Sequence, residues 1–268
     1  MSKVLTVIIA VLVILVGSAY LLTGSGSDTE LEGSARDTGM LDRGEVVPST
    51  EEEPVERREI PAPAPDLVES YSLSGDLPSI DDSDEAILNH LGLVVTPVAL
   101  QLFNDDQFIR KLVLQVDNAA RGELIYAHSP FAGPETGIDV TEENGGELEI
   151  NPQSYARYDA YAELAETVDT PLLVAYYQFY EPLLDEAYTE LGYPEGEFRS
   201  VLIKAIDQVL SAPVVEGEIA LAQPEANYVF EEASLEGLNM LQKQLLRMGP
   251  ENTQRVQMVL QRFKSRIQ

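Results

Sequence analysis

A long unbroken apolar run opens the hydrophobic pattern of this 268-residue chain. Residues 4–22 read VLTVIIAVLVILVGSAYLL and include no charged side chain. A helix rises about 1.5 Å per residue, so this run is about long enough to cross a hydrocarbon layer of roughly 30 Å. We therefore predict one transmembrane helix within residues 1–22, which anchors the protein to a membrane.

The charges on either side of this run predict its orientation. Lys3 precedes the run and only uncharged or acidic residues follow closely, which places the N-terminus in the cytoplasm and the rest of the chain outside. Gly17 and Ala19 have the small-residue spacing of a signal-peptide cleavage site, so a removed signal peptide is the alternative. The apolar run continues through Leu22, which favours a retained anchor. Both interpretations predict export.

Residues 23–80 have the composition of a disordered linker. The segment is rich in Gly, Ser, Pro, Asp and Glu, and it includes Glu51–Glu53 and the sequence IPAPAP at residues 60–65. Such a segment buries too little apolar surface to offset the conformational entropy that ordering would cost. As a coil it spans roughly 40 Å, so we interpret it as a spacer.

From residue 81 onward the apolar positions recur with the period of an α-helix. The apolar and aromatic residues of 171–191 follow the spacing of one helix face, and residues 198–210 repeat the pattern. Thr96–Pro97, Asn151–Pro152 and Thr170–Pro171 each pair a capping residue with proline at the first helical position. The predicted helices span about residues 82–91, 97–103, 106–120, 152–168, 171–191, 196–211, 234–248 and 250–267.

One segment interrupts the helical pattern. Ile138–Val140 and Glu147–Ile150 flank the turn-forming residues 144–146, which predicts a small β-hairpin, and another extended piece is predicted at residues 218–230. The predicted fold class is mostly α. It consists of a multi-helix soluble domain over residues 81–268 with a small β-hairpin insertion, preceded by one transmembrane helix and a disordered linker.

Composition narrows the classes of partner. The net charge is −29 and the chain has no cysteine. Because like charges repel, we predict no nucleic-acid partner, while basic ligands and cations stay open. Adaptation of the surface to high salt explains the acidity equally well. The absence of cysteine excludes disulfides, thiol catalysis and thiolate metal sites.

Tyrosine is concentrated in the middle of the domain, where eight of the twelve tyrosines lie between Tyr155 and Tyr193. A flat ring with a hydroxyl suits a groove for sugars or peptides. The helical spacing of these residues also fits packing between antiparallel helices, and the spacing favours this alternative over a groove. The candidate binding tyrosines are Tyr155, Tyr158, Tyr161, Tyr176, Tyr180, Tyr188 and Tyr193.

A second candidate site contains Arg157, Arg247, Asn252 and Arg255, in a domain where cations are scarce. Arginines beside the Gly249–Pro250 joint are placed to grip a carboxylate or phosphate at the start of the last helix. Internal pairing with some of the many acidic side chains is the alternative, and the composition favours it.

Catalysis has little support in the sequence. Glu181 with Asp185, and Glu186 with Glu190, have the i, i+4 spacing at which two carboxylates could act as acid and base. On the polar face of an amphipathic helix such pairs are usually solvated. The sequence contains no zinc, calcium, phosphate-loop or dinucleotide motif, so we predict no catalytic residue, no metal and no cofactor.

Several strings taken together resemble a known family. They are NPQSYARYDAY at residues 151–161, YEPLL at 180–184, AYTELGYP at 187–194 and LRMGPEN at 246–252, followed by Arg255. With the predicted anchor and linker, the sequence from about Leu77 to the C-terminus resembles the bacterial DUF3014 family. The resemblance implies a Gram-negative envelope, with residues 4–22 in the inner membrane and the C-terminal domain in the periplasm. It implies no catalytic residues.

We therefore expect a non-enzymatic envelope protein that binds another envelope protein through its tyrosine-rich region. One alternative is a protein that binds peptidoglycan, or another glycan or peptide, through the same surface. The other is an unrecognised hydrolase that uses a carboxylate pair.

Overall fold

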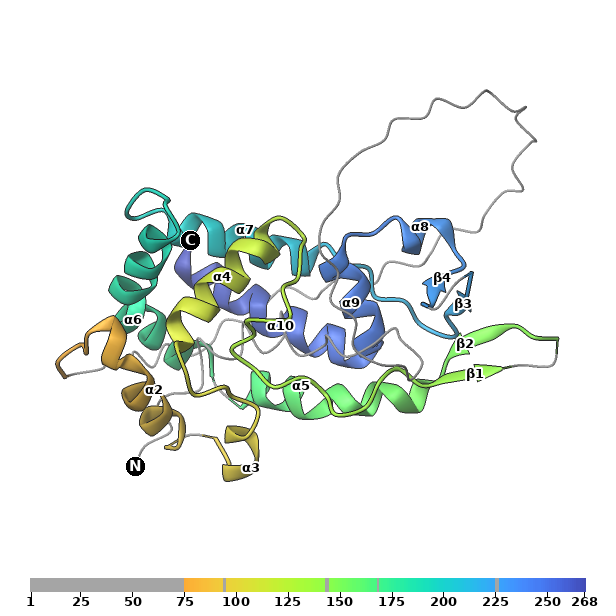
Figure 1. Ribbon diagram of the computed structural model, residues 1–268, viewed down its shortest axis with the longest axis horizontal. Coiled ribbons are helices and arrows are strands. Elements are labelled where there is room, and N and C mark those ends of the chain that lie inside the picture. The colour runs from red at the N-terminus through yellow and green to blue at the C-terminus, as the bar shows by residue number, and fades with distance from the viewer. Residues whose placement is uncertain (1–74, 94, 143–144, 168, 225–226) are drawn as a thin grey trace, which may run out of the picture.

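A computed structural model describes residues 75–93, 95–142, 145–167, 169–224 and 227–268. These residues form short 3₁₀ helices (η), α-helices and four strands (Figure 1). In chain order the elements are η1 (Ile80–Asp82), α2 (Ser83–Leu91), α3 (Pro97–Leu100), α4 (Phe108–Ala120), β1 (Val140–Glu142), β2 (Leu148–Ile150), η2 (Pro152–Tyr158), α5 (Asp159–Glu166), α6 (Thr170–Glu190), α7 (Phe198–Leu210), β3 (Ala220–Ala222), β4 (Val229–Phe230), α8 (Ala233–Glu236), α9 (Met240–Met248) and α10 (Pro250–Ile267).

The larger of two hydrophobic cores lies among the long helices. The helix α4 packs against α6 and α7, and α10 packs against α5, α6 and α7. Leu112 and Val116 of α4, Ala205 of α7 and Leu260 of α10 are fully buried there. The apolar faces predicted for residues 171–191 and 198–210 are therefore largely the faces that α6 and α7 bury, and burial of apolar surface is the main stabilising contribution.

A smaller core lies under a four-stranded antiparallel sheet of order β1-β2-β3-β4. In Figure 1 this sheet occupies one end of the long axis, and α6 lies toward the other end. The β1–β2 hairpin confirms the predicted insertion, with Val140 opposite Ile150. The prediction was incomplete, because β3 and β4 come from the second extended segment and enlarge the hairpin to four strands. The mostly helical fold class is confirmed.

Helix starts agree with the predicted caps to within one residue. The side chain of Thr96 accepts a hydrogen bond from the Ala99 N–H at 3.2 Å. Asn151 likewise accepts from the Gln153 N–H at 3.0 Å. The cap of α6 is Asp169 instead of Thr170, because the Asp169 carboxylate accepts from the Leu172 N–H at 3.1 Å.

Three predicted helices are wrong in their detail. The segment predicted at 97–103 ends at Leu100, and the segment at 152–168 begins with the 3₁₀ helix η2 before α5. The segment at 234–248 is two helices, because Asn239 and Gln242 form a capping box that starts α9 anew. A capping box satisfies two N–H groups that a continuous helix would have paired internally.

Two predictions concern residues that the structure does not describe. The anchor at residues 1–22 lies outside the described residues, and so does the linker up to residue 74. At the end of the linker, Ile80 is already buried in the helical core. Among the described helices, none has both the length and the apolar character that crossing a membrane requires.

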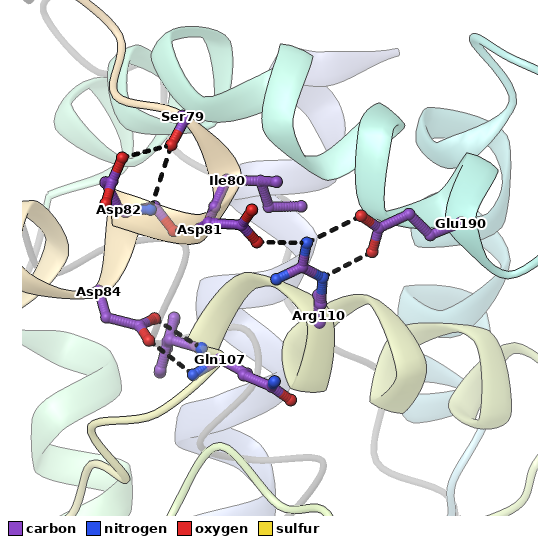
Figure 2. Close-up of polar contacts among 10 residues, drawn as sticks. Ser79, Ile80, Asp81, Asp82, Asp84, Gln107, Arg110 and Glu190 are labelled. Carbon is purple, nitrogen blue, oxygen red and sulfur yellow. Dashed lines mark hydrogen bonds and ion pairs between the residues drawn. The ribbon is translucent and has the colours of Figure 1, made fainter.

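Polar contacts dock the first two elements onto the helical body (Figure 2). Arg110 of α4 donates to Glu190 at the end of α6 and to Asp81 in η1. Asp84 of α2 accepts the backbone N–H groups of Gln107 and Phe108 at 2.6 and 2.8 Å. Asp84 thus caps α4 from another helix, where Gln107 has a left-handed φ of 50° and no capping side chain of its own.

We expect Asp84→Ala to lower the free energy of unfolding by about 1–2 kcal/mol, because two N–H groups at the start of α4 lose their acceptor. Glu85→Ala is the matched control, since Glu85 is an exposed neighbour in the same helix. Urea denaturation followed by circular dichroism measures both. Equal losses for the two variants would show that Asp84 does not cap α4.

Candidate functional site

Most of the candidate binding tyrosines lie in the helical core. Five of them have 3% or less of their surface exposed, namely Tyr158, Tyr161, Tyr176, Tyr180 and Tyr188. Several of their hydroxyl groups have hydrogen-bond partners inside the domain. Tyr161 donates to the Ala132 carbonyl at 2.8 Å, and the Tyr180 hydroxyl pairs with the His90 ring at 2.7 Å. Burial raises the pKa of Tyr161 to about 12. The packing alternative therefore describes these five residues, and they line no open groove.

The two remaining candidate tyrosines reach the surface. Tyr155 is half-buried in η2. Tyr193 is 38% exposed, and its ring stacks on that of Tyr188 with 4.5 Å between centroids. The tyrosines predicted as one surface are thus divided between the core and two separate positions.

Two members of the arginine cluster make internal contacts. Asn252 is buried, and its amide donates to the Tyr155 carbonyl at 3.2 Å and to Asp159 at 3.0 Å. Arg255 donates to Glu166 at 2.6 Å. For these two residues the internal-pairing alternative is the correct one.

The other two members, Arg157 of η2 and Arg247 of α9, have no such partners. The Arg157 guanidinium lies over the Tyr158 ring at 4.8 Å, and that of Arg247 lies over the Phe230 ring at 5.1 Å. Neither guanidinium makes a hydrogen bond or an ion pair with any residue that the structure describes. The Nε and Nη1 atoms of Arg157 are also shielded from solvent. These two residues are the candidate site, called the arginine pair below.

The other cations of similar burial show what is usual for a half-buried charge in this domain. Within the described ranges, each remaining half-buried lysine or arginine forms an ion pair with a carboxylate; these residues are Arg110, Lys111, Lys243, Arg255 and Lys264. Buried polar groups nearly always have partners, and each exception calls for a physical reason. The lack of an ion pair at either arginine is therefore a local property of this site in an otherwise acidic protein.

Without an anion, the positive charges of the arginine pair are electrostatically unfavourable. Burial lowers the pKa of Arg247, and the positive charge of Arg157 lowers it further. An arginine nevertheless stays protonated at neutral pH, so the charge cannot be relieved by losing a proton. Glu236 is the acidic residue that acts on Arg247, but its carboxylate already accepts from Lys243 and from the Phe230 N–H.

Two further residues belong to this surface, and sequence reasoning missed both. Tyr126 lies in the loop after α4, is 43% exposed, and lies close enough to Arg247 for the two groups to influence each other's pKa. Ser154 of η2 is buried, and its hydroxyl has no hydrogen-bond partner. Tyr126 lies in a loop, where no periodic pattern distinguishes it. Ser154 lies beside a helix start, where a serine is usually interpreted as a capping residue.

A close approach between η2 and the α9–α10 joint positions Arg157. Gly249 has a φ of 83°, and a Cβ added to it would lie 2.5 Å from Cγ of Tyr155. Only glycine fits this contact, since the left-handed backbone and the Tyr155 ring both exclude a side chain. The ring packs on the joint directly after Met248, so η2 lies against the C-terminal end of α9, where Arg247 is found.

Carboxylates line a separate open groove of about 700 Å³ along α6. Its acidic residues are Glu181, Asp185, Glu186, Glu190 and Glu195. Several are already engaged: Glu181 pairs with Arg199 at 2.7 Å, Glu190 pairs with Arg110, and Asp185 accepts the Phe198 N–H at 3.3 Å. The hydrogen bonds from Arg110 lower the pKa of Glu190, whereas burial raises that of Asp185. No group of His, Asp and Glu side chains suited to a metal ion occurs in the described part of the chain.

Comparison with known proteins identifies the family. The family described as "Protein of unknown function (DUF3014)" matches residues 108–264. The chain belongs to the DUF3014 family. The family region includes Tyr126, Ser154 and the arginine pair. No curated protein and no solved structure matches the chain.

Arg247→Met tests whether the DUF3014 domain retains an unpaired charge at a cost in stability. We expect the free energy of unfolding to stay within about 0.5 kcal/mol or to rise by up to about 1 kcal/mol, since an uncompensated charge is replaced by an apolar chain of similar length. Arg255→Met, which breaks the ion pair with Glu166, should instead lower it by about 0.5–1 kcal/mol. Urea denaturation compares them, and a larger loss for Arg247→Met would contradict the interpretation.

Proposed function

We propose that this DUF3014 protein is a single-pass protein of the bacterial inner membrane whose helical domain lies in the periplasm and binds another envelope protein without catalysing a reaction. The observation that carries the binding role is the arginine pair: neither guanidinium forms an ion pair with a described residue, Nε and Nη1 of Arg157 are shielded from solvent without a partner, and burial lowers the pKa of Arg247. Arginine and tyrosine dominate the energetic centres of protein interfaces. The exposed ring of Tyr126 beside Arg247 fits that composition.

The geometry supports protein binding better than the two alternatives. Sugar recognition uses exposed aromatic faces, and five of the candidate tyrosines are buried. Hydrolysis by a carboxylate pair needs one acid that can hold a proton and one free base. In the α6 groove, Glu181 and Glu190 are each held by an arginine, which favours a structural role, and the hydrogen bonds from Arg110 lower the pKa of Glu190.

The membrane location is supported by the sequence of residues 4–22 and by the length of the linker. An uncharged run of nineteen residues between Lys3 and an acidic segment fits an anchor with its N-terminus in the cytoplasm. A linker of residues 23–80 allows the domain to reach a partner tens of ångströms from the bilayer.

A C-terminal fusion to an enzyme that is active only outside the cytoplasm tests this orientation. We expect activity in membranes from cells expressing the full-length fusion, because the positive flank is retained on the cytoplasmic side. Deleting residues 4–22 should remove both the activity and the membrane association. A fusion active only as a cytoplasmic reporter would contradict the proposed topology.

Site-specific photo-crosslinking in intact membranes tests partner binding. A photo-reactive residue in place of Tyr126 should give one discrete adduct with an envelope protein. Arg157→Gln combined with Arg247→Gln should abolish that adduct, because the charged contacts beside Tyr126 are lost. Arg262→Gln is the control and should leave it intact, since Arg262 is exposed on α10. An adduct that survives loss of both arginines would show that this surface is not the binding site.

A further inference from the structure

We infer that the arginine pair, together with the hydroxyl of Ser154, forms a binding site for a carboxylate group of the partner polypeptide. The inference rests on the proposed function, in that it names the chemical group that the partner presents at this surface.

The charge of the site requires an anion. Burial and the positive charge of Arg157 both oppose the charged form of Arg247, and Glu236, the acid that acts on Arg247, is already paired with Lys243. Two of the three guanidinium nitrogens of Arg157 are shielded from solvent without a partner, so water offers them little compensation. Removing a charge from water costs several kcal/mol unless a counter-charge and hydrogen bonds replace the lost solvation. An anion between the two guanidiniums supplies both.

The pair keeps donors that a ligand can reach, because Nη2 of Arg157 and the guanidinium nitrogens of Arg247 are not among the solvent-shielded atoms without a partner. A cation above a ring is attracted through the flat face of the guanidinium, whereas its N–H groups point outward in its plane. The Cζ atoms of Arg157 and Arg247 lie 4.8 and 5.1 Å from the ring centroids of Tyr158 and Phe230. Both rings are buried and therefore fixed. The arginines are thus held in place before a ligand arrives, which reduces the entropy lost on binding.

Ser154 adds a donor of a different kind on the same side of η2. In a 3₁₀ helix the side chains of residues i and i+3 eclipse each other, so Ser154 and Arg157 share one edge of η2. The Ser154 hydroxyl is shielded from solvent and has no partner, although a hydroxyl can both donate and accept. An unpartnered hydroxyl on the edge of η2 that carries Arg157 is a further donor for an oxygen anion.

The surroundings favour a carboxylate over a phosphate. The chain carries a net charge of −29, so its field repels a doubly charged phosphate more strongly than a singly charged carboxylate. Tyr126 places a partly exposed aromatic ring next to Arg247, where the carbon chain that bears a carboxylate can pack. An acidic side chain or the C-terminus of a polypeptide meets both conditions.

The test measures binding of N-acetyl-L-aspartate N-methylamide, which carries one carboxylate, to the full-length protein in a non-ionic detergent. Two-dimensional NMR of the arginine Nε–Hε groups reports directly on the site, and titration with sodium chloride at the same ionic strength removes the general effect of salt. We expect saturable shifts of the Arg157 and Arg247 signals. We expect Arg247→Met and Arg157→Gln to weaken binding at least about tenfold, and Ser154→Ala to weaken it by roughly threefold to tenfold. Arg262→Gln should bind as the unmodified protein does.

Inorganic phosphate is the competing probe and should bind more weakly than the carboxylate. Tighter binding of phosphate, equal shifts with chloride, or carboxylate binding that survives Arg247→Met would overturn the inference. The photo-crosslinked adduct at Tyr126 separates the two proposals. An adduct that depends on the arginines but is not competed by the aspartate derivative would retain the binding function and reject the carboxylate.

Discussion

The contact between Tyr155 and Gly249 holds together the two halves of the domain. Tyr155 packs into the core under the sheet, while Tyr158, three residues later, belongs to the core of the long helices. The helix α9 is shared in the same way, because Leu245 faces the helical core and Leu246 faces the sheet core. A glycine is required at residue 249 for this arrangement, since any Cβ would collide with Tyr155. The arginine pair lies on η2 and α9, the two elements that join both cores.

This position explains how two cations come to be partly buried. Arg157 is next to Tyr158, and Arg247 is between Leu246 and Met248, so each is flanked by residues that are fixed in a core. Long side chains at such positions lay their stems along apolar surface, and at Arg157 the burial extends to Nε and Nη1 of the guanidinium. The aromatic rings of Tyr158 and Phe230 then keep each guanidinium in place. The packing that joins the two cores therefore also organises the candidate site.

The features of the fold that depend on local sequence were predictable, and the others depend on tertiary contacts. The starts at Thr96 and Asn151 were correct because a capping side chain and a following proline act within one helical turn. The break at Asn239 was missed although the Asn239–Gln242 capping box is present in the sequence, because the apolar period continues across it. Strands β3 and β4 have only three and two residues, so their pairing with β2 and with each other determines them more than their own pattern does. For the tyrosines, spacing correctly favoured the core for Tyr176 and Tyr180.

The candidate site is defined by the absence of ion pairs at its two arginines. No local sequence pattern predicts this absence, because it depends on tertiary contacts. Arg157, Arg247 and Arg255 look alike in the sequence, yet among the described residues only Arg255 of the three forms an ion pair, and the acid that acts on Arg247, Glu236, is paired with Lys243. The chain has 46 acidic and 17 basic residues, so carboxylates greatly outnumber the cations that they can pair with. Selection for stability would favour such a pair, because an unpaired buried charge is costly and a single substitution can supply a partner. Two neighbouring arginines that stay unpaired in so acidic a protein are therefore best explained by an anion that comes from another molecule.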